Sequence, residues 1–145
     1  MTAATRDPVD LPAPDTGLPG LAGLVRFLET GVAPAGLFAD ILFADLSFPH
    51  WRLQATSAAE LVRLRAERHP WPGRVRLERA ARTPSGFVVA LEERWRAEGQ
   101  DWYCRESFWA DVEDGTITGL RVMCTGDWDE ETQRQHAEEV TLTRP

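Results

Sequence analysis

The sequence predicts an α+β protein in which about three N-terminal helices pack on one face of a bent antiparallel β-sheet, with a short C-terminal helix. Three observations lead to this class. Apolar residues at helical spacing come early in the chain, four strand-like segments follow one another later, and the turns between those segments are short. Helices that come first and a run of strands that follows are typical of α+β domains.

The first half of the chain holds the predicted helices. The stretch "PGLAGLVRFLETG" should form a helix that ends at Gly31. Ser57 and Glu60 have the spacing of a capping box, so a second helix should begin there and end near His69, before a proline. Apolar alternation between the helices predicts a strand over about 40–48. The apolar face of the first helix would consist of Leu21, Leu24, Val25 and Leu28.

The second half predicts four consecutive strands: "GRVRLERAART", "GFVVALEERWRA", "DWYCRESFWADV" and "TITGLRVMCTG". Asp127 and Glu130 have capping spacing, which predicts a last helix over 128–139. The dipeptides Glu98-Gly99 and Asp114-Gly115 should each form a two-residue hairpin turn. These turns fix a register, and the register divides the side chains between two faces.

The two cysteines are too few and too far apart in the chain to suggest a zinc site. They also fall on opposite faces in this register, so we expect no disulfide between them, although a β-bulge would reverse that assignment. One face carries Val88, Ala90, Glu92, Arg94, Tyr103, Arg105, Ser107, Trp109, Leu120, Val122 and Cys124. The opposite face carries Phe87, Val89, Leu91, Glu93, Trp95, Trp102, Cys104, Glu106, Phe108, Ile117, Arg121 and Met123.

Composition limits the possible partners. The 145 residues include 43% apolar and 27% charged side chains, enough for one globular domain with a core of its own. All basic residues are arginines, and 23 acidic against 16 basic residues give a net charge of -7. Nucleic acid and anionic membranes are therefore disfavoured as partners. Because both sheet faces are apolar and the helices cover only one, we expect a homodimer.

The ends of the chain suggest its organisation and location. Residues 1–17 are rich in proline and scattered charge and should form a flexible arm, and 18–145 should form a single domain. No apolar run is long enough for a membrane span, and the start lacks the pattern of a secretory signal. We expect a cytoplasmic protein.

The order of elements, the stretch "LFADILFADLSF" after the first helix and the closing "DGTITGLRVMCTGDW" resemble the nuclear-transport-factor-2-like superfamily of cone-shaped domains. This superfamily includes SnoaL-like polyketide cyclases, ketosteroid isomerases, limonene-epoxide hydrolases and scytalone dehydratases. The resemblance covers about residues 18–140. It implies a cone-shaped sheet around an apolar cavity. It also implies that Leu120, Val122 and Cys124 face that cavity, so the face that carries them is expected to be the concave one.

Within this resemblance, Asp45 falls on the position of the general-base aspartate of the steroid isomerases. A carboxylate at the inner end of an apolar cone loses hydration, which raises its pKa and suits it to act as a base. Alternatively, Asp45 ends its strand at a solvated rim. Leu24 and Ser107 replace the oxyanion-hole groups of that family, and Arg96 and Val122 replace the aspartates of the epoxide hydrolases. Neither reaction is therefore transferred to this chain.

Further candidates surround Asp45 in the predicted register. Arg94 and Arg105 would stabilise negative charge and Glu92 would pair with Arg105, unless these groups form an exposed ion pair. Arg94 also resembles an arginine of the epoxide hydrolases. His50 is a candidate acid, or else a surface residue. Substrate contacts would come from Phe43, Trp51, Glu92, Tyr103, Ser107, Trp109, Leu120, Val122 and Cys124.

The leading functional hypothesis is an enzyme without cofactor or metal that acts by proton transfer on a hydrophobic, polyketide-like small molecule. Cyclisation, isomerisation and dehydration all fit this description. Two alternatives stay open at this point: a non-catalytic module that binds a small ligand or a protein, and a dimerisation domain whose own side chains fill the cone.

Overall fold

A computed structural model describes residues 17–144, so the arm predicted over residues 1–17 lies, except for Gly17, outside the described residues. The described chain forms the elements α1 (Leu21–Thr30), β1 (Phe38–Phe48), β2 (Trp51–Ser57), α2 (Ala58–Arg68), β3 (Gly73–Thr83), β4 (Gly86–Ala97), β5 (Gln100–Glu113), β6 (Thr116–Cys124) and α3 (Glu130–Glu139). Among these described residues, none of the helices has the length and apolar character needed to cross a bilayer.

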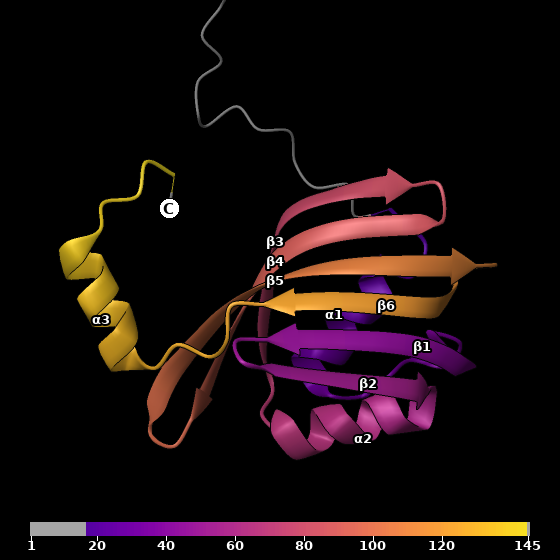
Figure 1. The fold of residues 1–145 in the computed structure, drawn as a ribbon, viewed down its shortest axis with the longest axis horizontal. Helices are drawn as coiled ribbons and strands as arrows, with labels where there is room; N and C mark the ends of the chain where they lie inside the picture. Colours follow the sequence, from indigo (N-terminus) through magenta and orange to yellow (C-terminus); the bar gives the residue numbers. More distant parts are fainter. Residues whose placement is uncertain (1–16, 145) are drawn as a thin grey trace, which may run out of the picture.

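The six strands form one curled sheet in the order β2-β1-β6-β5-β4-β3 (Figure 1). Helices α1 and α2 both pack on its concave side, and α3 lies apart from them beside the long β4–β5 hairpin. The sheet is mixed, because β1 runs parallel to β6 while the other pairs are antiparallel. The α+β cone predicted from the sequence is confirmed, with this one parallel pair and the strand β2 as additions. The described residues have two helices ahead of β3, where about three were predicted, and the predicted C-terminal helix is present.

Helix α1 supplies much of the cover over the sheet. Its apolar side chains recur at helical spacing and pack against the concave face. Gly31 ends the helix as predicted: at φ +77° it donates its N–H to the carbonyl of Phe27 at 2.7 Å. The buried residues of this helix are Leu21, Leu24, Phe27 and Leu28.

Helix α2 begins at the predicted capping box. The Ser57 side chain accepts a hydrogen bond from the Glu60 amide at 3.1 Å, and the Glu60 carboxylate accepts one from the Thr56 amide at 3.1 Å. The last helix begins at a different cap from the one predicted. Asp129, not Asp127, accepts the hydrogen bond from the Thr132 amide at 2.8 Å. Asp127 is thus left for another role.

The two hairpin turns are confirmed, since Ala97 pairs with Gln100 and Glu113 with Thr116. Beyond the second turn the register shifts by one residue, between the pairs Asp111–Gly119 and Val112–Ile117. Side chains alternate between the two faces along a strand. The shift therefore places the side chains of β6 on the opposite face, relative to those of β5, from the one predicted. The cavity side of the sheet therefore combines residues from both predicted lists.

Candidate functional site

A cavity of about 520 Å³ lies between the concave face of the sheet and the helices α1 and α2. Its volume is in the range of pockets that hold small organic molecules. Trp51 stands on its wall with more than half of its surface exposed, so we place the mouth there. The apolar walls consist of Leu24, Phe27, Leu28, Leu46, Phe48, Leu53, Leu61, Leu64, Phe108, Leu120 and Val122.

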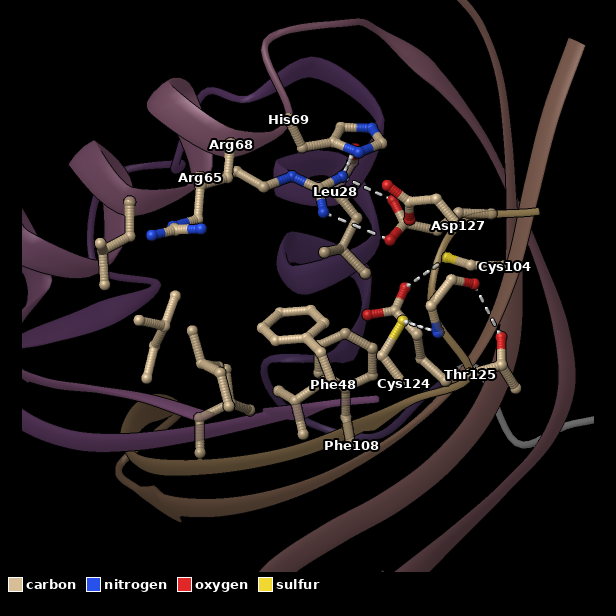
Figure 2. Close-up of a pocket in the computed structure, with 18 of the residues that line it drawn as sticks. Leu28, Phe48, Arg65, Arg68, His69, Cys104, Phe108, Cys124, Thr125 and Asp127 are labelled. Carbon is tan, nitrogen blue, oxygen red and sulfur yellow. Dashed lines mark hydrogen bonds and ion pairs between the residues drawn. The ribbon is translucent and has the colours of Figure 1, made fainter. Parts of the chain in front are cut away.

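Polar side chains gather at one part of this apolar space (Figure 2). They come from four elements and from the segments after α2 and β6, so no short stretch of sequence contains them. The group consists of Arg65 from α2, His69 after α2, Glu93 from β4, Cys104 and Glu106 from β5, Cys124 from β6, and Asp127.

Arg65 is held in place by two neighbouring groups. Its Nη2 donates to the Leu28 carbonyl at 2.7 Å and to Oε1 of Glu93 at 2.5 Å, while its Nη1 donates to Oε2 of Glu93 at 3.2 Å. The side chains of Arg65 and Glu93 are only 14% and 5% exposed. Nε of Arg65 is buried and has no hydrogen-bond partner among the described residues. A buried donor without a partner is costly, so this N–H would gain free energy from any acceptor that reached it.

Glu93 and Glu106 form a pair of carboxyl groups with opposite pKa shifts. Burial opposes ionisation of Glu93, but a hydrogen bond from Glu106 and the charge of Arg65 hold the pKa of Glu93 below its usual value. Burial raises the pKa of Glu106 well above its usual value, and the neighbouring charge of Glu93 raises it further. Ionisation is therefore easier at Glu93 than at Glu106, and Glu93 carries the negative charge of the pair first.

The two cysteines flank Glu106 on the cavity side. The Cys104 thiol donates to Oε1 of Glu106 at 3.4 Å, and the Gly126 amide donates to Sγ of Cys124 at 3.3 Å. Hydrogen bonding to Cys124 and burial raise the pKa of Cys104. Hydrogen bonds from Cys104 and from the Gly126 amide lower the pKa of Cys124. Both cysteines are free thiols.

Asp127 and His69 complete the polar group. Asp127 lines the cavity and is exposed, and no described residue donates a hydrogen bond to its carboxylate. Loss of hydration and the charge of Glu93 raise the pKa of Asp127. The His69 ring lies 4.4 Å from the Trp95 ring, centroid to centroid. Burial and the charge of Arg65 lower the pKa of His69 to about 4, so its imidazole is neutral at pH 7.

Four of the predicted substrate-contacting residues line this cavity: Trp51, Leu120, Val122 and Cys124. The last three were placed there through the resemblance of the last strand. The predicted separation of the cysteines is wrong, because the register shift brings Cys124 opposite Glu106 and onto the face of Cys104. A β-bulge was expected to reverse the assignment of the cysteines to opposite faces, and such an irregularity is present between β5 and β6.

Asp45 does not lie at the inner end of the cavity. Its neighbours Ala44 and Leu46 face the helices, so Asp45 faces the outer side of the sheet. There it forms a bidentate ion pair with Arg52, whose Nε donates to Oδ1 at 2.8 Å. This hydrogen bonding lowers the pKa of Asp45, the opposite of the expected shift. The expected placement is wrong, because β2 supplies a guanidinium on the outer face.

The remaining candidates also lie outside the cavity. Glu92 accepts hydrogen bonds from Arg76 at 3.0 Å and from Arg94 at 3.2 Å, and Arg105 pairs with Glu78 instead of Glu92. The expected inward orientation of this group is wrong, because the alternation of β4 and β5 is opposite to the one assumed. The other outward-facing or turn residues are Phe43, His50, Tyr103, Ser107 and Trp109.

Arg65, Glu93 and Glu106 were not identified as site residues from the sequence. Two of these three carry a local signal that could have identified them. Glu93 and Glu106 each occupy a position in a row of alternating apolar residues, where a charged side chain is unusual. Arg65, by contrast, lies in a helix rich in arginine. Nothing in its local pattern separates it from its neighbours.

Comparisons with known proteins support the fold. No protein-family model matches the sequence, and no curated protein matches it. A hypothetical protein of ketosteroid-isomerase-like fold from Catenulispora acidiphila, solved with trimethylamine, is 11% identical with a TM-score of 0.61, over 73% of this chain and 85% of that one. An epoxide hydrolase of M. tuberculosis that resembles limonene-epoxide hydrolase is 13% identical with a TM-score of 0.54, over 77% and 80%.

A third solved structure, a protein from Jannaschia proposed to be a SnoaL-like polyketide cyclase, is 12% identical with a TM-score of 0.54, over 85% of this chain and 93% of that one. At such identities the likeness concerns the fold. The chain has the cone-shaped fold of the nuclear-transport-factor-2-like proteins, with its cavity between the helices and the concave face.

Proposed function

We propose that the protein is an enzyme that transfers a proton on an apolar small molecule bound in the cavity, in an isomerisation, cyclisation or dehydration. One observation carries this proposal: the apolar cavity ends beside a buried, fixed guanidinium whose Nε–H has no partner among the described residues. Such a group suits a substrate oxygen on which negative charge develops. Polyketide-like substrates fit the apolar walls, and the likeness to the Jannaschia protein supports them.

Arg65 is the electrostatic stabiliser in this proposal. The Leu28 carbonyl and Glu93 hold the guanidinium in place, and a movement of the side chains that cover Nε would let a substrate oxygen accept its hydrogen bond. Asp127 is the base, because it lines the cavity and no described residue engages its carboxylate in a hydrogen bond or ion pair. Asp127 removes a proton beside the substrate carbonyl, and Arg65 stabilises the enolate that forms.

The outer face of the sheet is the proposed dimer interface. Phe43, Trp109 and Met123 are each about half exposed there, which is unusual for large apolar side chains on one surface. A second copy related by a two-fold axis would cover them. Size measurement by light scattering should therefore give a dimer, and Trp109→Glu should give a monomer with its cavity intact. A monomeric wild-type protein would remove the dimer from the proposal.

The proposed location is the cytoplasm, where the free thiols of Cys104 and Cys124 stay reduced.

A second candidate is ligand binding without chemistry. It is favoured by the contacts of Glu93 and Glu106, because each carboxyl group is already bound to a neighbouring side chain and is therefore poorly placed to take a proton from a substrate. The hypothetical protein from Catenulispora, solved with trimethylamine, supports a small-ligand role for such a cavity. In this case ligands would bind and leave unchanged.

The test measures proton exchange, because the substrate need not be known in advance. A panel of apolar ketones and enones is incubated with the protein in deuterated water, and loss of α-proton signals is followed by NMR. We expect the wild type to accelerate exchange and Asp127→Asn to slow it about 100-fold with binding retained.

Asp45→Asn is the matched control, because it removes a carboxylate from the opposite face of the same sheet. It should exchange protons as the wild type does. If Asp127→Asn is as active as the wild type, Asp127 is not the base. Binding without any exchange would favour the second candidate.

A further inference from the structure

We propose that Cys104, Glu106 and Cys124 form a binding site for a thiophilic divalent metal ion, with Zn²⁺ as the best fit. The two sulfur atoms and a carboxylate oxygen of Glu106 all lie within 4.8 Å of one another. Two thiolates with one carboxylate favour zinc over calcium or magnesium, which prefer oxygen ligands. The sequence alone predicted no metal here, because two cysteines so far apart in the chain do not suggest a zinc site.

The spacing of the donor atoms agrees with a tetrahedral site. Sγ of Cys104 lies 3.4 Å from Oε1 of Glu106. With zinc–sulfur bonds of about 2.3 Å and zinc–oxygen bonds of about 2.0 Å, a tetrahedral ion separates such a pair by about 3.5 Å. These two side chains therefore need little movement to bind one ion.

The sheet explains why these three side chains meet. Cys104 and Glu106 are two residues apart on β5, so they share a face. Cys124 on β6 is the register partner of Glu106. Two residues of one strand and one from the neighbouring strand thus point into the same corner, and both strands lie inside the sheet and not at its edge.

A second, independent feature is the amide donor behind Cys124. The Gly126 N–H donates to Sγ of Cys124 at 3.3 Å, and Gly126 reaches this position with φ at +84°. An N–H donor to sulfur stabilises a thiolate, and groups of this kind orient and tune metal ligands from behind. A glycine suits this backbone conformation, which other residues adopt at a cost.

The surrounding charge also favours a cation. Glu93, Glu106 and Asp127 bring three carboxyl groups to this end of the cavity, and Arg65 is the described guanidinium paired with one of them. The other arginine on the cavity wall, Arg68, lies over the ring of Trp51, where we place the mouth. A divalent ion would offset this excess of acidic groups, of which Glu93 and Glu106 are buried.

The proposed site would leave a coordination position for a ligand. All three donors line the cavity, and a four-coordinate ion bound by three side chains keeps one position open. Metal binding goes beyond the proposed function, which uses Arg65 and Asp127 and none of the three metal ligands. Each proposal can therefore fail without the other.

The experiment uses the full chain, purified under reducing conditions and stripped of metal with a chelator. Co²⁺ is the optical probe, because thiolate ligands give charge-transfer absorption and a tetrahedral site gives intense visible bands. We expect one equivalent of Co²⁺ to bind, both bands to appear, and Zn²⁺ to displace the cobalt. Zinc should also protect both cysteines from a thiol reagent.

Cys104→Ser and Cys124→Ser should each weaken Zn²⁺ binding by at least about tenfold and abolish or shift the charge-transfer band. His136→Gln, which removes a possible ligand far from the cavity on α3, should bind as the wild type does. Circular dichroism confirms that each variant is folded. If a serine variant does not fold, the test is the protection of both cysteines by zinc in the wild type. Cysteines that react equally fast with and without zinc would then overturn the proposal.

Absence of a charge-transfer band in the wild type would overturn the proposal. Bands that persist unchanged in both serine variants would overturn it equally, because the ion would then be held elsewhere.

Discussion

Two carboxylate–guanidinium pairs lie on opposite faces of the same sheet, and their difference locates the functional site. Glu93 binds Arg65 on the concave side, and Asp45 binds Arg52 on the outer side, each with a closest N–O distance of 2.5 Å. The arginines differ in their surroundings: the side chain of Arg65 is 14% exposed and that of Arg52 is 64% exposed. Helix α2 carries Arg65 under cover, whereas Arg52 lies on the edge strand β2.

The comparison teaches that the presence of a carboxylate does not define a site in this fold. Water around Arg52 weakens its pair with Asp45, and the Asp45 carboxylate is fully engaged by that pair. Around Arg65 the apolar walls exclude water, so charge interactions are stronger and an unpaired N–H is more costly. The cover provided by α1 and α2 creates the chemical environment.

The largest predicted effect is the loss of folding stability when the buried Glu93–Arg65 pair is broken, which should exceed the loss from breaking the outer Asp45–Arg52 pair. Glu93→Gln leaves the buried Arg65 charge without its partner and should lower the free energy of unfolding by about 3–5 kcal/mol. Urea denaturation followed by tryptophan fluorescence measures this loss. A loss as small as that of an exposed ion pair would mean that Arg65 reaches water.

A double variant sharpens this prediction. Arg65→Met combined with Glu93→Leu removes both charges, so it should be more stable than Glu93→Gln alone. The double variant should nevertheless lose affinity for the ketone ligands, because the Nε–H is gone. Additive losses from the two substitutions would contradict the existence of a coupled buried pair.

An intermediate effect concerns His69 beside the buried pair. Its pKa is lowered to about 4 in the folded protein, while the ordinary value is 6.5. The unfolded chain therefore binds more protons between these pH values, and stability falls as the pH drops from 6.5 towards 4. We expect the contribution of His69 to this loss to be about 1–2 kcal/mol, since the side chain is partly exposed.

His69→Gln tests that expectation. Urea denaturation of both proteins at about pH 7 and about pH 4.5 isolates the histidine, because carboxyl groups common to both proteins titrate alike. The variant should lose less stability on acidification than the wild type. Equal losses would show that the imidazole of His69 is charged as easily in the folded protein as in the unfolded one.

The smallest effect belongs to the outer pair. Arg52→Gln removes an exposed guanidinium from Asp45, whose own side chain is only 8% exposed, and should lower the free energy of unfolding by about 1 kcal/mol, because water reaches the place that Arg52 leaves. Ligand binding in the cavity should not change at all. A large loss of ligand affinity in Arg52→Gln would return Asp45 to consideration as part of the site.

The sequence predicted the fold well because turn chemistry and periodicity are local. The glycine turns fixed where β4 and β5 end and where β5 and β6 begin, and the capping box fixed the start of α2. The prediction of which side chains face the cavity failed because of one irregular register step near Thr118. No local sequence pattern indicates this step. A shift of one residue moves every side chain of a strand to the opposite face.

Arg65 illustrates the other limit of the sequence. It is one of several arginines in α2, and its role depends on Glu93 from a strand 28 residues away. Glu93 and Glu106 could have been recognised as charged residues within apolar rows. Their pairing with α2 could not, because it depends on how the helix crosses the curled sheet.

The most direct test of the central claim follows the arginine side chains by NMR during ligand binding. The claim is that ligands bind in the concave cavity and accept a hydrogen bond from Nε–H of Arg65. Titration of the tightest-binding ketone should shift the Arg65 Nε–H resonance and leave that of Arg52 in place. A shift at Arg52 with none at Arg65 would contradict the claim and place the ligand on the outer face.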